Sequence, residues 1–393
     1  MYRGDKDFRL GIELCKTHDV KYSILVPDVA SPGDRRFFRT VRFPRKQIPS
    51  LPRNMNIIYL KSRLIFFSKS NLSLGGFFQY SSMYPRLIKK LKPDLILENP
   101  YTTLTPRSYQ TYFASKVNEV PMVYIDPGDI PPKGALKKIL SRFERPVINY
   151  AEHVVVYNEM GRTRFAEEYG FPKEYITVIP KPVDTRQFTP GLHRDEARSR
   201  IGARDRFVVG YMGRLSNNKG GIHMMEVARR FKEDGLSDRF FFLFAGGNIT
   251  ESDAKPFHAM KRKYGLDNVH FTGKVRHRDM NAYQAACDLI VYPDVTNLPG
   301  FSSVLAESMA MGKAIVIGNK GFEGATPIRD RVNGMVIQAR NPGDIIEAIR
   351  ELSVDDVQRK KYEEAVREYA VKEMDWKEQA KIFKRIFDKA VDA

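Results

Sequence analysis

The feature that most constrains this chain is a regular succession of short apolar runs separated by longer helical or loop-like segments. The first half contains six such runs, at residues 22–26, 56–60, 94–98, 122–125, 153–157 and 176–179. The second half contains six more, at residues 207–212, 240–245, 269–272, 289–292, 314–317 and 335–337. Apolar strands that alternate with helices are typical of a parallel sheet. The sequence therefore predicts an α/β fold made of two Rossmann-like domains.

The length of 393 residues is comfortable for two domains of nearly 200 residues each. Pro180, Pro182 and Pro190 mark the joint between the two sets of strands. We expect an N-terminal domain over residues 1–188 and a C-terminal domain over residues 189–375. Residues 376–393 are predicted to be a helix, because their apolar side chains recur every three or four positions.

The stretch FVVGYMGRLSNNKGG at residues 207–221 leads from an apolar strand through a turn into a helix that begins near Lys219. Turns of this kind at the carboxyl edge of a parallel sheet hold phosphorylated ligands, because free backbone amides and the positive helix end meet there. Arg214 and Lys219 bring two cations to the same turn. The stretch is thus a candidate phosphate site.

A second stretch, GFSSVLAESMAMG at residues 300–312, places Glu307 in an otherwise apolar helical turn. A buried carboxylate without a partner costs roughly several kcal/mol. We therefore expect Glu307 to meet a ligand hydroxyl or a donor from the protein itself.

These two motifs together resemble glycosyltransferase family 4, whose members are retaining enzymes of the GT-B fold that use sugar nucleotides. The resemblance extends to VIPKPVDTRQFTP, FFFLFAGG, NVHFTGKV and NGMVI, and it covers about residues 150–390 well and the N-terminal half loosely. It implies two Rossmann-like domains that face each other across a cleft, with the last helix crossing back to the first domain. It also implies that a nucleotide sugar is a substrate, and that neither a cofactor nor a metal is needed.

The resemblance also implies roles for particular residues. Arg214 and Lys219 match the positions that hold the donor diphosphate, and Gly213 and Gly220 beside them are included among the donor-binding residues. Glu307 matches the residue that binds the ribose hydroxyls. Lys274 and Val275 match the loop that lies against the base. The backbone amides of Phe301, Ser302 and Ser303 match those that face the phosphate.

Two departures from the family pattern stand out. The family has a second glutamate before the one that matches Glu307, with seven residues between them, and this chain has Pro299 there. Its loss bears on which sugar is used and on activity itself. In addition, the chain enters at a helix near residues 6–17 and lacks the family's first strand. Either further residues before Met1 supply that strand, which is what we expect, or this domain is built differently.

Groups on the acceptor side should follow the strands of the first domain. Asp126 and Asp129 in YIDPGDIPP are the preferred catalytic candidates, and Glu98 and Asn99 in LENPY are others. An alternative is that the two aspartates and their prolines simply form a turn with Asx-type hydrogen bonds.

The net charge of +18 is concentrated in the first half. Residues 35–93 contain 14 basic residues and no acidic one, interleaved with Phe66, Phe67, Phe77 and Phe78. Basic residues mixed with aromatic ones suit an anionic membrane surface. A solvated basic loop over an ordinary helix is the alternative, and nucleic acid is not expected because no motif for it accompanies the charge.

The sequence thus predicts a retaining glycosyltransferase that moves a sugar from a nucleotide donor to a lipid-linked or cell-envelope glycan acceptor. Only two cysteines, Cys15 and Cys287, are present, and no apolar run is long enough to span a membrane. We therefore expect a cytoplasmic protein, peripheral on the membrane. The alternatives are a sugar-nucleotide epimerase or hydrolase of the same fold, and a non-catalytic member that binds sugar nucleotide or membrane.

Overall fold

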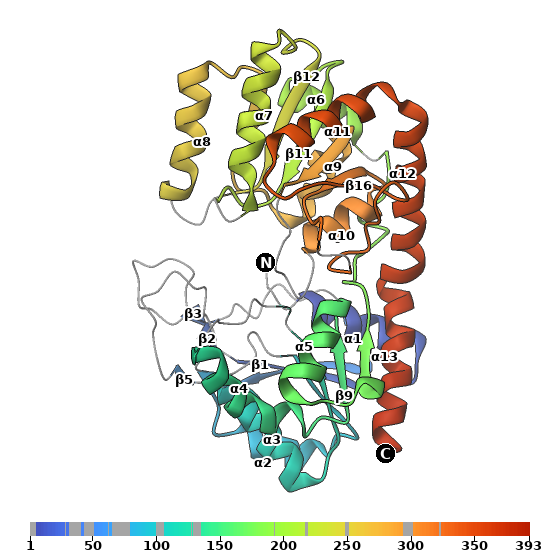
Figure 1. Cartoon of the computed structure of the whole chain (residues 1–393). Coiled ribbons are helices and arrows are strands. Elements are labelled where there is room, and N and C mark those ends of the chain that lie inside the picture. Colours follow the sequence, from blue (N-terminus) through green and yellow to red (C-terminus); the bar gives the residue numbers. More distant parts are fainter. Residues whose placement is uncertain are drawn as a thin grey trace. The chain divides into compact units, whose positions relative to one another are not determined.

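The computed structural model describes residues 5–27, 29–30, 41–42, 51–61, 63–64, 79–99, 106–126, 128, 135–191, 193–216, 219–247, 251–293, 302–321 and 324–393. The contacts divide the chain into two compact units (Figure 1). The first unit comprises residues 1–179 and 376–393, and the second comprises residues 180–375.

The boundary was expected after residue 188, and the contacts place it after Ile179. Residues 180–188, the linker segment, lie between the two positions. Val183 and Phe188 in this segment are buried in a core cluster of the second unit, which is why the contacts assign the segment to that unit. Helix α13, Trp376–Val391, packs on α1, Asp5–Thr17, and therefore belongs to the first unit.

The described residues of the first unit form ten strands, several of them very short. They are β1 (Tyr22–Pro27), β2 (Val29–Ala30), β3 (Val41–Arg42), β4 (Met55–Leu60), β5 (Arg63–Leu64), β6 (Gln79–Tyr80), β7 (Ile96–Glu98), β8 (Met122–Ile125), β9 (His153–Val156) and β10 (Ile176–Val178). Its helices, besides α1 and α13, are α2 (Tyr84–Leu91), α3 (Pro106–Asn118), α4 (Ala135–Ile148), α5 (Glu159–Tyr169) and η1 (Lys173–Tyr175).

A four-stranded parallel sheet in the order β10-β9-β8-β7 forms the centre of this unit, and β1 pairs in parallel with β4 separately. Side chains alternate between its two faces, as a strand requires. Val123 and Ile125 of β8 pack with residues of α1 and α13, whereas Met122 and Tyr124 pack with residues of α3, α4 and α5. The further strand that the sequence suggests before Met1 stays a prediction.

The second unit is a doubly wound α/β domain. Its strands are β11 (Phe207–Met212), β12 (Phe240–Ala245), β13 (Val269–Phe271), β14 (Leu289–Tyr292), β15 (Ala314–Ile317) and β16 (Met335–Val336). Its helices are α6 (Arg194–Ile201), α7 (Gly221–Glu233), α8 (Glu251–Tyr264), η3 (His277–Asp279), α9 (Met280–Ala286), α10 (Ser303–Ala310), α11 (Pro342–Val354), α12 (Asp356–Tyr369) and η4 (Ala370–Met374).

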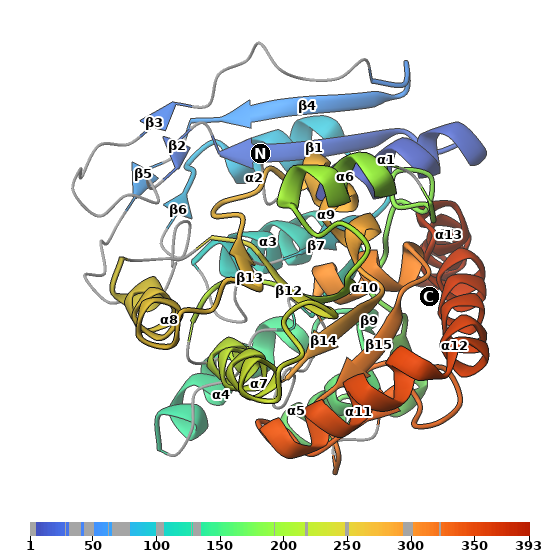
Figure 2. The same ribbon diagram turned by 90° about the horizontal axis from the view of Figure 1, so that it is seen from above.

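The six strands form one parallel sheet in the order β13-β12-β11-β14-β15-β16. Helices α7, α8 and α11 cover one face and α6, α9 and α10 the other (Figure 2). Within β11, Val208 packs toward the second set of helices and the adjacent Val209 toward the first. The predicted α/β architecture with two Rossmann-like domains is confirmed, and all twelve expected strands are present, with ends that differ by at most two residues.

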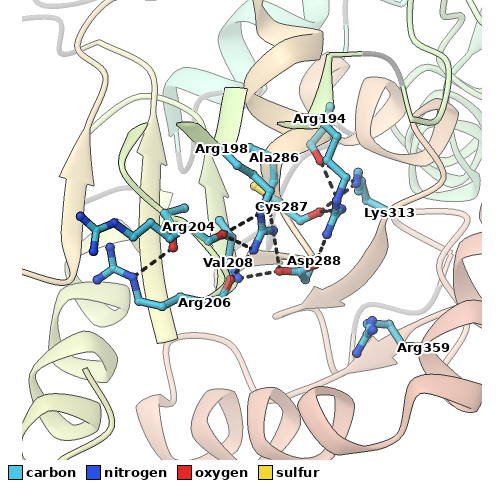
Figure 3. A network of polar contacts seen from close by, with 12 residues as sticks. Arg194, Arg198, Arg204, Arg206, Val208, Ala286, Cys287, Asp288, Lys313 and Arg359 are labelled. Atoms are coloured by element: carbon cyan, nitrogen blue, oxygen red, sulfur yellow. Dashed lines mark hydrogen bonds and ion pairs between the residues drawn. The ribbon is translucent and has the colours of Figure 1, made fainter. Parts of the chain in front are cut away.

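A network of charged side chains lies at the amino-terminal edge of this sheet (Figure 3). Asp288, which directly precedes β14, accepts hydrogen bonds from the backbone of Val208 at 2.7 Å and from Arg198 at 3.0 Å, and it also pairs with Arg194. The buried Lys313 ammonium donates to the carbonyl of Cys287 at 2.8 Å. Burial acts to raise the pKa of the Asp288 carboxyl, but these donors outweigh it and hold the pKa below its ordinary value.

Among the helices that the structure describes, none combines the length and the apolar composition that crossing a membrane requires.

Candidate functional site at the carboxyl edge of the second sheet

The strand order of the second unit creates a switch point between β11 and β14. The chain moves outward through β12 and β13 on one side and through β15 and β16 on the other. In open parallel sheets the loops after the two central strands diverge there, which leaves a ligand crevice at their carboxyl ends. The two motifs singled out from the sequence follow β11 and β14, so topology brings both to this point.

The turn after β11 is pressed against the turn after β12. Gly246 has a φ of 145°, and a Cβ atom on it would lie 2.1 Å from the carbonyl oxygen of Gly213. Only glycine fits this approach. The hydroxyl of Tyr211 donates to the carbonyl of Arg214 at 2.9 Å and lies 3.3 Å from that of Lys219, so it braces the turn from the core side.

The structure places the phosphate-binding candidates on this braced turn. The side chain of Arg214 is exposed and that of Lys219 is half-buried. Gly220 is the N-cap of α7 with a φ of 70°, so the helix begins at Gly221, two residues after the expected start. Gly213 and Arg214 thus directly follow the central strand, and Lys219 and Gly220 directly precede α7.

The helix after β14 presents its amino end to the same edge. Ser302 is the N-cap of α10, and its side chain accepts from the backbone of Val304 at 3.3 Å. Ser303 is the first residue of the helix and is half-buried. The first amides of a helix have no partner within it and carry a partial positive charge, which suits a phosphate. Phe301 and Pro299 lie outside the described residues.

Glu307 is buried on α10 and is 4% exposed. One carboxylate oxygen, Oε1, lies 2.8 Å from Nε2 of His277. The other, Oε2, is buried and has no hydrogen-bond partner among the residues that the structure describes. Burial raises the pKa of this carboxyl, and the interactions with His277 and Lys181 partly offset that rise. A buried oxygen in this condition is the kind of group that a ligand hydroxyl satisfies.

The loop after β13 closes the same side of the site. A Cβ atom on Gly247 would lie 3.1 Å from Cβ of Lys274, so the loops after β12 and β13 are in contact. The side chain of Lys274 is exposed, and Val275 packs against the core. Two residues beyond Val275 the chain reaches His277 and hence Glu307. A continuous series of contacts therefore links the loops after β11, β12 and β13 to α10.

His277 is the residue of this site that the sequence analysis missed, because it lies in none of the residues that the motifs singled out. Its ring packs edge-on against Phe188, with the ring centroids 5.6 Å apart. Thirty residues separate it from Glu307, and the two meet because His277 lies in the β13–β14 connection and Glu307 on the helix after β14. A histidine two residues after the candidate base loop is the one signal that could have drawn attention to it.

The acceptor-side candidates that the structure describes lie in the first unit. Asp126, at the end of β8, is buried, and its Oδ1 accepts from the backbone of Gly128 at 3.1 Å and lies 3.9 Å from Arg164. This is the Asx-type bond that the alternative interpretation expects, while a catalytic role for Asp126 stays a prediction. Asp129 lies outside the described residues.

Of the other two candidates, Glu98 is held by hydrogen bonds. Both oxygens of the buried Glu98 accept hydrogen bonds from α3, at 2.9 Å from Ser108 and 2.7 Å from Thr111. Asn99 is half-buried. Within the described part of the chain, no group of three or more His, Cys, Asp or Glu side chains is arranged to hold a metal ion.

Comparison with known proteins gives the family of the chain. A family model described as "Glycosyl transferases group 1" matches residues 193–370, and one described as "Glycosyltransferase Family 4" matches residues 18–187. The chain belongs to glycosyltransferase family 4. The Family 4 match ends at residue 187 and the group 1 match begins at residue 193, near the division between the two units.

Curated relatives match the chain at 24–29% identity. A D-inositol 3-phosphate glycosyltransferase of Corynebacterium kroppenstedtii is 25% identical over 63% of this chain and 55% of its own length. A GDP-mannose-dependent alpha-(1-6)-phosphatidylinositol monomannoside mannosyltransferase of Mycobacterium tuberculosis is 29% identical over 49% of this chain and 50% of its own length. The chain therefore spans about half the length of the curated relatives it matches.

Solved structures show the same fold over more of the chain. Anabaena HepE in complex with UDP has a TM-score of 0.69 at 20% identity and covers 85% of this chain and 87% of its own. This likeness establishes the GT-B fold.

Proposed function

We propose that this protein is a retaining glycosyltransferase that transfers a sugar from a nucleotide donor to a lipid-linked or cell-envelope glycan acceptor. The binding of a nucleotide-sugar donor is inferred from the state of Glu307 beside the switch point of the second sheet. Its Oε2 atom is buried and has no hydrogen-bond partner among the described residues. A pair of ribose hydroxyls supplies the donors that this carboxylate lacks.

The remaining donor contacts follow from the elements around Glu307. Arg214 and Lys219 neutralise the diphosphate on one side, with Gly213 and Gly220 leaving room for it. The amides of Phe301, Ser302 and Ser303 receive it on the other side, at the positive end of α10. Lys274 and Val275 lie against the base. These groups stabilise the charge that develops on the departing nucleoside diphosphate, because they are fixed in place before the reaction begins.

The relatives support a nucleotide donor and suggest the acceptor class. Two are named as glycosyltransferases of an inositol phosphate and of a phosphatidylinositol monomannoside, the second GDP-mannose-dependent, and HepE was solved with UDP and with UDP-glucose. An acceptor that carries a polyol or a lipid-linked sugar is in keeping with these names. The acceptor hydroxyl is assigned to the neighbourhood of Asp126 and Asp129, with retention of configuration proposed from the family.

We assign the protein to the cytoplasm, peripheral on a membrane through the basic segment at residues 35–93. About half of this segment, including Phe66, Phe67, Phe77 and Phe78, lies outside the described residues. A lipid-linked acceptor gives such a contact its purpose, because an enzyme held at the surface meets its substrate at high local concentration.

A second candidate function rests on Pro299. Because the family's first carboxylate is missing at this position, a donor-binding protein that hydrolyses or epimerises its sugar nucleotide, or that only binds it, remains the alternative. Incubation with the sugar nucleotide alone and with acceptor extract separates the three outcomes. Transfer only when the extract is present supports the glycosyltransferase.

The decisive experiment on the donor site compares Glu307→Gln with the native protein. Titration calorimetry with UDP and GDP and with their 2′-deoxy counterparts measures how much each protein gains from the ribose hydroxyl. Native protein should prefer the better ribonucleotide by about 10-fold or more, and Glu307→Gln should lose most of that preference. Glu364→Gln, an exposed acid on α12, is the matched control. Equal preference in all three proteins, or no binding of either nucleotide by the native protein, contradicts the assignment.

A further inference from the structure

The outer surface of the helices α2, α3 and α4 in the first unit exposes large apolar side chains. Phe113 is 57% exposed, Val117 80%, Phe143 56% and Met83 51%. Single exposed apolar residues are common on soluble proteins, but a group of them on neighbouring helices marks an interaction surface. Figure 1 shows the three helices side by side, and contacts join α2 to α3 and α3 to α4.

These side chains are not needed to cover the sheet. Ile88 of α2 and Ala114 of α3 are buried in one core cluster with Ile96 of β7. Val147 and Ile148 of α4 are buried in the cluster beneath β8 and β9. Each helix therefore has its own inward face, and the exposed residues lie on the other side.

An array of aromatic rings connects the exposed groups of α3 and α4. The ring of Phe113 lies 5.0 Å from that of Tyr112 and 6.2 Å from that of Tyr109, measured between centroids. Tyr112 in turn meets Tyr150 edge-on at 5.1 Å, and the Tyr109 hydroxyl donates to the carbonyl of Phe143. Tyrosine rings with an apolar body and a polar tip are enriched at the level of lipid headgroups.

Cations surround this array. Arg86, Lys89 and Lys90 are exposed on α2, Lys116 on α3 and Arg142 on α4. No ion pair joins any of these five to an acid within the described part of the chain. Among the described residues, the exposed acids that closely follow these helices are Asp94 after α2, Glu119 after α3 and Glu152 after α4.

We propose that this surface, the α2–α4 face, docks on an anionic lipid bilayer, with Phe113, Val117 and Phe143 inserted among the headgroups and the cations bound to anionic lipids. Lysine is depleted in the centres of protein interfaces, whereas it strengthens binding to anionic lipid. A second copy of this chain is disfavoured because it presents the same positive charge.

The proposal rests on the proposed function for its purpose, which is access to a lipid-linked acceptor. It also locates the proposed membrane contact on described helices. Of these, α2 belongs to the basic segment at residues 35–93, and α3 and α4 extend the contact beyond that segment.

The test is flotation of the full chain with vesicles of phosphatidylcholine that contain about 0–40% phosphatidylglycerol. The charge variant is Lys89→Glu with Lys90→Glu, and the apolar variant is Phe113→Ser with Val117→Ser. We expect the charge variant to bind at least about 10-fold more weakly at low salt, because each cation at the surface contributes separately. The apolar variant should lose about 10-fold of the binding that persists at high salt, where charge attraction is screened.

Matched controls come from the end of α11 and from α12 in the second unit. Lys360→Glu with Lys361→Glu changes charge equally, and Val354→Ser with Val357→Ser removes two valines that are 74% and 81% exposed. Both controls should float like the native protein. Unfolding curves of all variants should coincide with the native curve, since every changed side chain is exposed.

Several outcomes overturn the proposal. They are a native protein that does not float with the most anionic vesicles, variants of the face that float no less than their controls, and native self-association that the apolar variant abolishes without changing flotation. Single-stranded RNA that displaces the protein from vesicles more effectively than anionic lipid also counts against it. Nucleotide binding measured without vesicles tests the donor site separately, so either idea can fail while the other stands.

Discussion

The two edges of the second sheet both carry a carboxylate among cations, and they differ in whether the protein itself satisfies it. At the amino-terminal edge, Asp288 receives donors from Arg194, Arg198 and the Val208 backbone, so the group is closed (Figure 3). At the carboxyl edge, Glu307 has His277 on one oxygen and no hydrogen-bond partner on the other among the described residues. A closed network stabilises the fold, whereas an incomplete one is available to a ligand.

The largest expected effect is at the closed edge. Asp288→Asn removes the charge that three donors share and leaves two guanidinium groups partly buried without it. We expect a loss of about 3 kcal/mol in the free energy of unfolding. Urea unfolding measures it, with the exposed Asp238→Asn as control. A change below about 0.5 kcal/mol means that the network does not hold the fold.

A reciprocal pair of substitutions separates the edges next. Arg214→Ala should weaken nucleoside diphosphate binding by about 10- to 100-fold with little change in unfolding, and Lys219→Ala should behave in the same way. Arg198→Ala should do the reverse, costing about 2 kcal/mol in unfolding while nucleotide affinity is unchanged. Calorimetry and urea unfolding on the same samples supply both numbers. If unfolding shifts equally in all three variants, the division into a binding edge and a structural edge is wrong.

A smaller effect concerns the pH dependence of nucleotide binding. Glu307 accepts ribose hydroxyls as a carboxylate, so affinity should fall as pH falls toward its raised pKa. His277→Gln removes an interaction that lowers this pKa, which should move the fall in affinity to higher pH, while Lys181 and the hydroxyl of Tyr292 still face the carboxyl. We expect about a 3- to 10-fold loss at about pH 6 and a smaller one at about pH 8. Parallel pH profiles for variant and native protein refute a role for His277 in positioning or tuning Glu307.

The smallest expected effect extends the comparison to the first unit. His153 begins β9 at the amino edge of that sheet, and its Nε2 lies 2.7 Å from the hydroxyl of Thr177. Burial, together with the charge of Lys389, lowers the pKa of His153 to about 4. The unfolded histidine binds a proton near pH 6.5 and the folded one resists it, so stability present above pH 6.5 is lost as pH falls toward 4.

His153→Gln should remove this part of the acid sensitivity, worth ~1–2 kcal/mol after allowance for solvent screening. The measurement is the free energy of unfolding between about pH 7 and pH 4.5. An identical pH slope in variant and native protein shows that His153 does not titrate as the buried position requires.

Strands and their order along the chain were predictable because each is a short apolar run between breaks. β8, β11, β12, β14 and β15 were predicted to the residue. The two-residue strands β2, β3, β5 and β6 were not predicted, since two residues carry no periodicity. The turn containing Arg214 and the helix containing Glu307 were identified as a candidate site from residue types and from their positions after strands.

The sequence did not reveal which residues would become hydrogen-bond or packing partners. The bond between His277 and Glu307, the approach of Gly246 to Gly213 and the exposure of Phe113 and Val117 all depend on which strands are neighbours. Residues about 30 or more apart have no local signal that they will meet. Phe113 and Val117 look like core residues of a helix until the sheet beneath them fixes the inward face.

The sequence alone determined the α/β class, the positions of the main strands and which charged residues follow them, because hydrophobic period and turn chemistry act over a few residues. Only the tertiary structure decided which carboxylates are closed by the protein and which stay incomplete. Residue type does not separate Glu98, Asp288 and Glu307, since all three are acids beside apolar strands or helices. What distinguishes them is the set of donors that packing brings within hydrogen-bond reach, and that set is assembled from segments far apart in the chain.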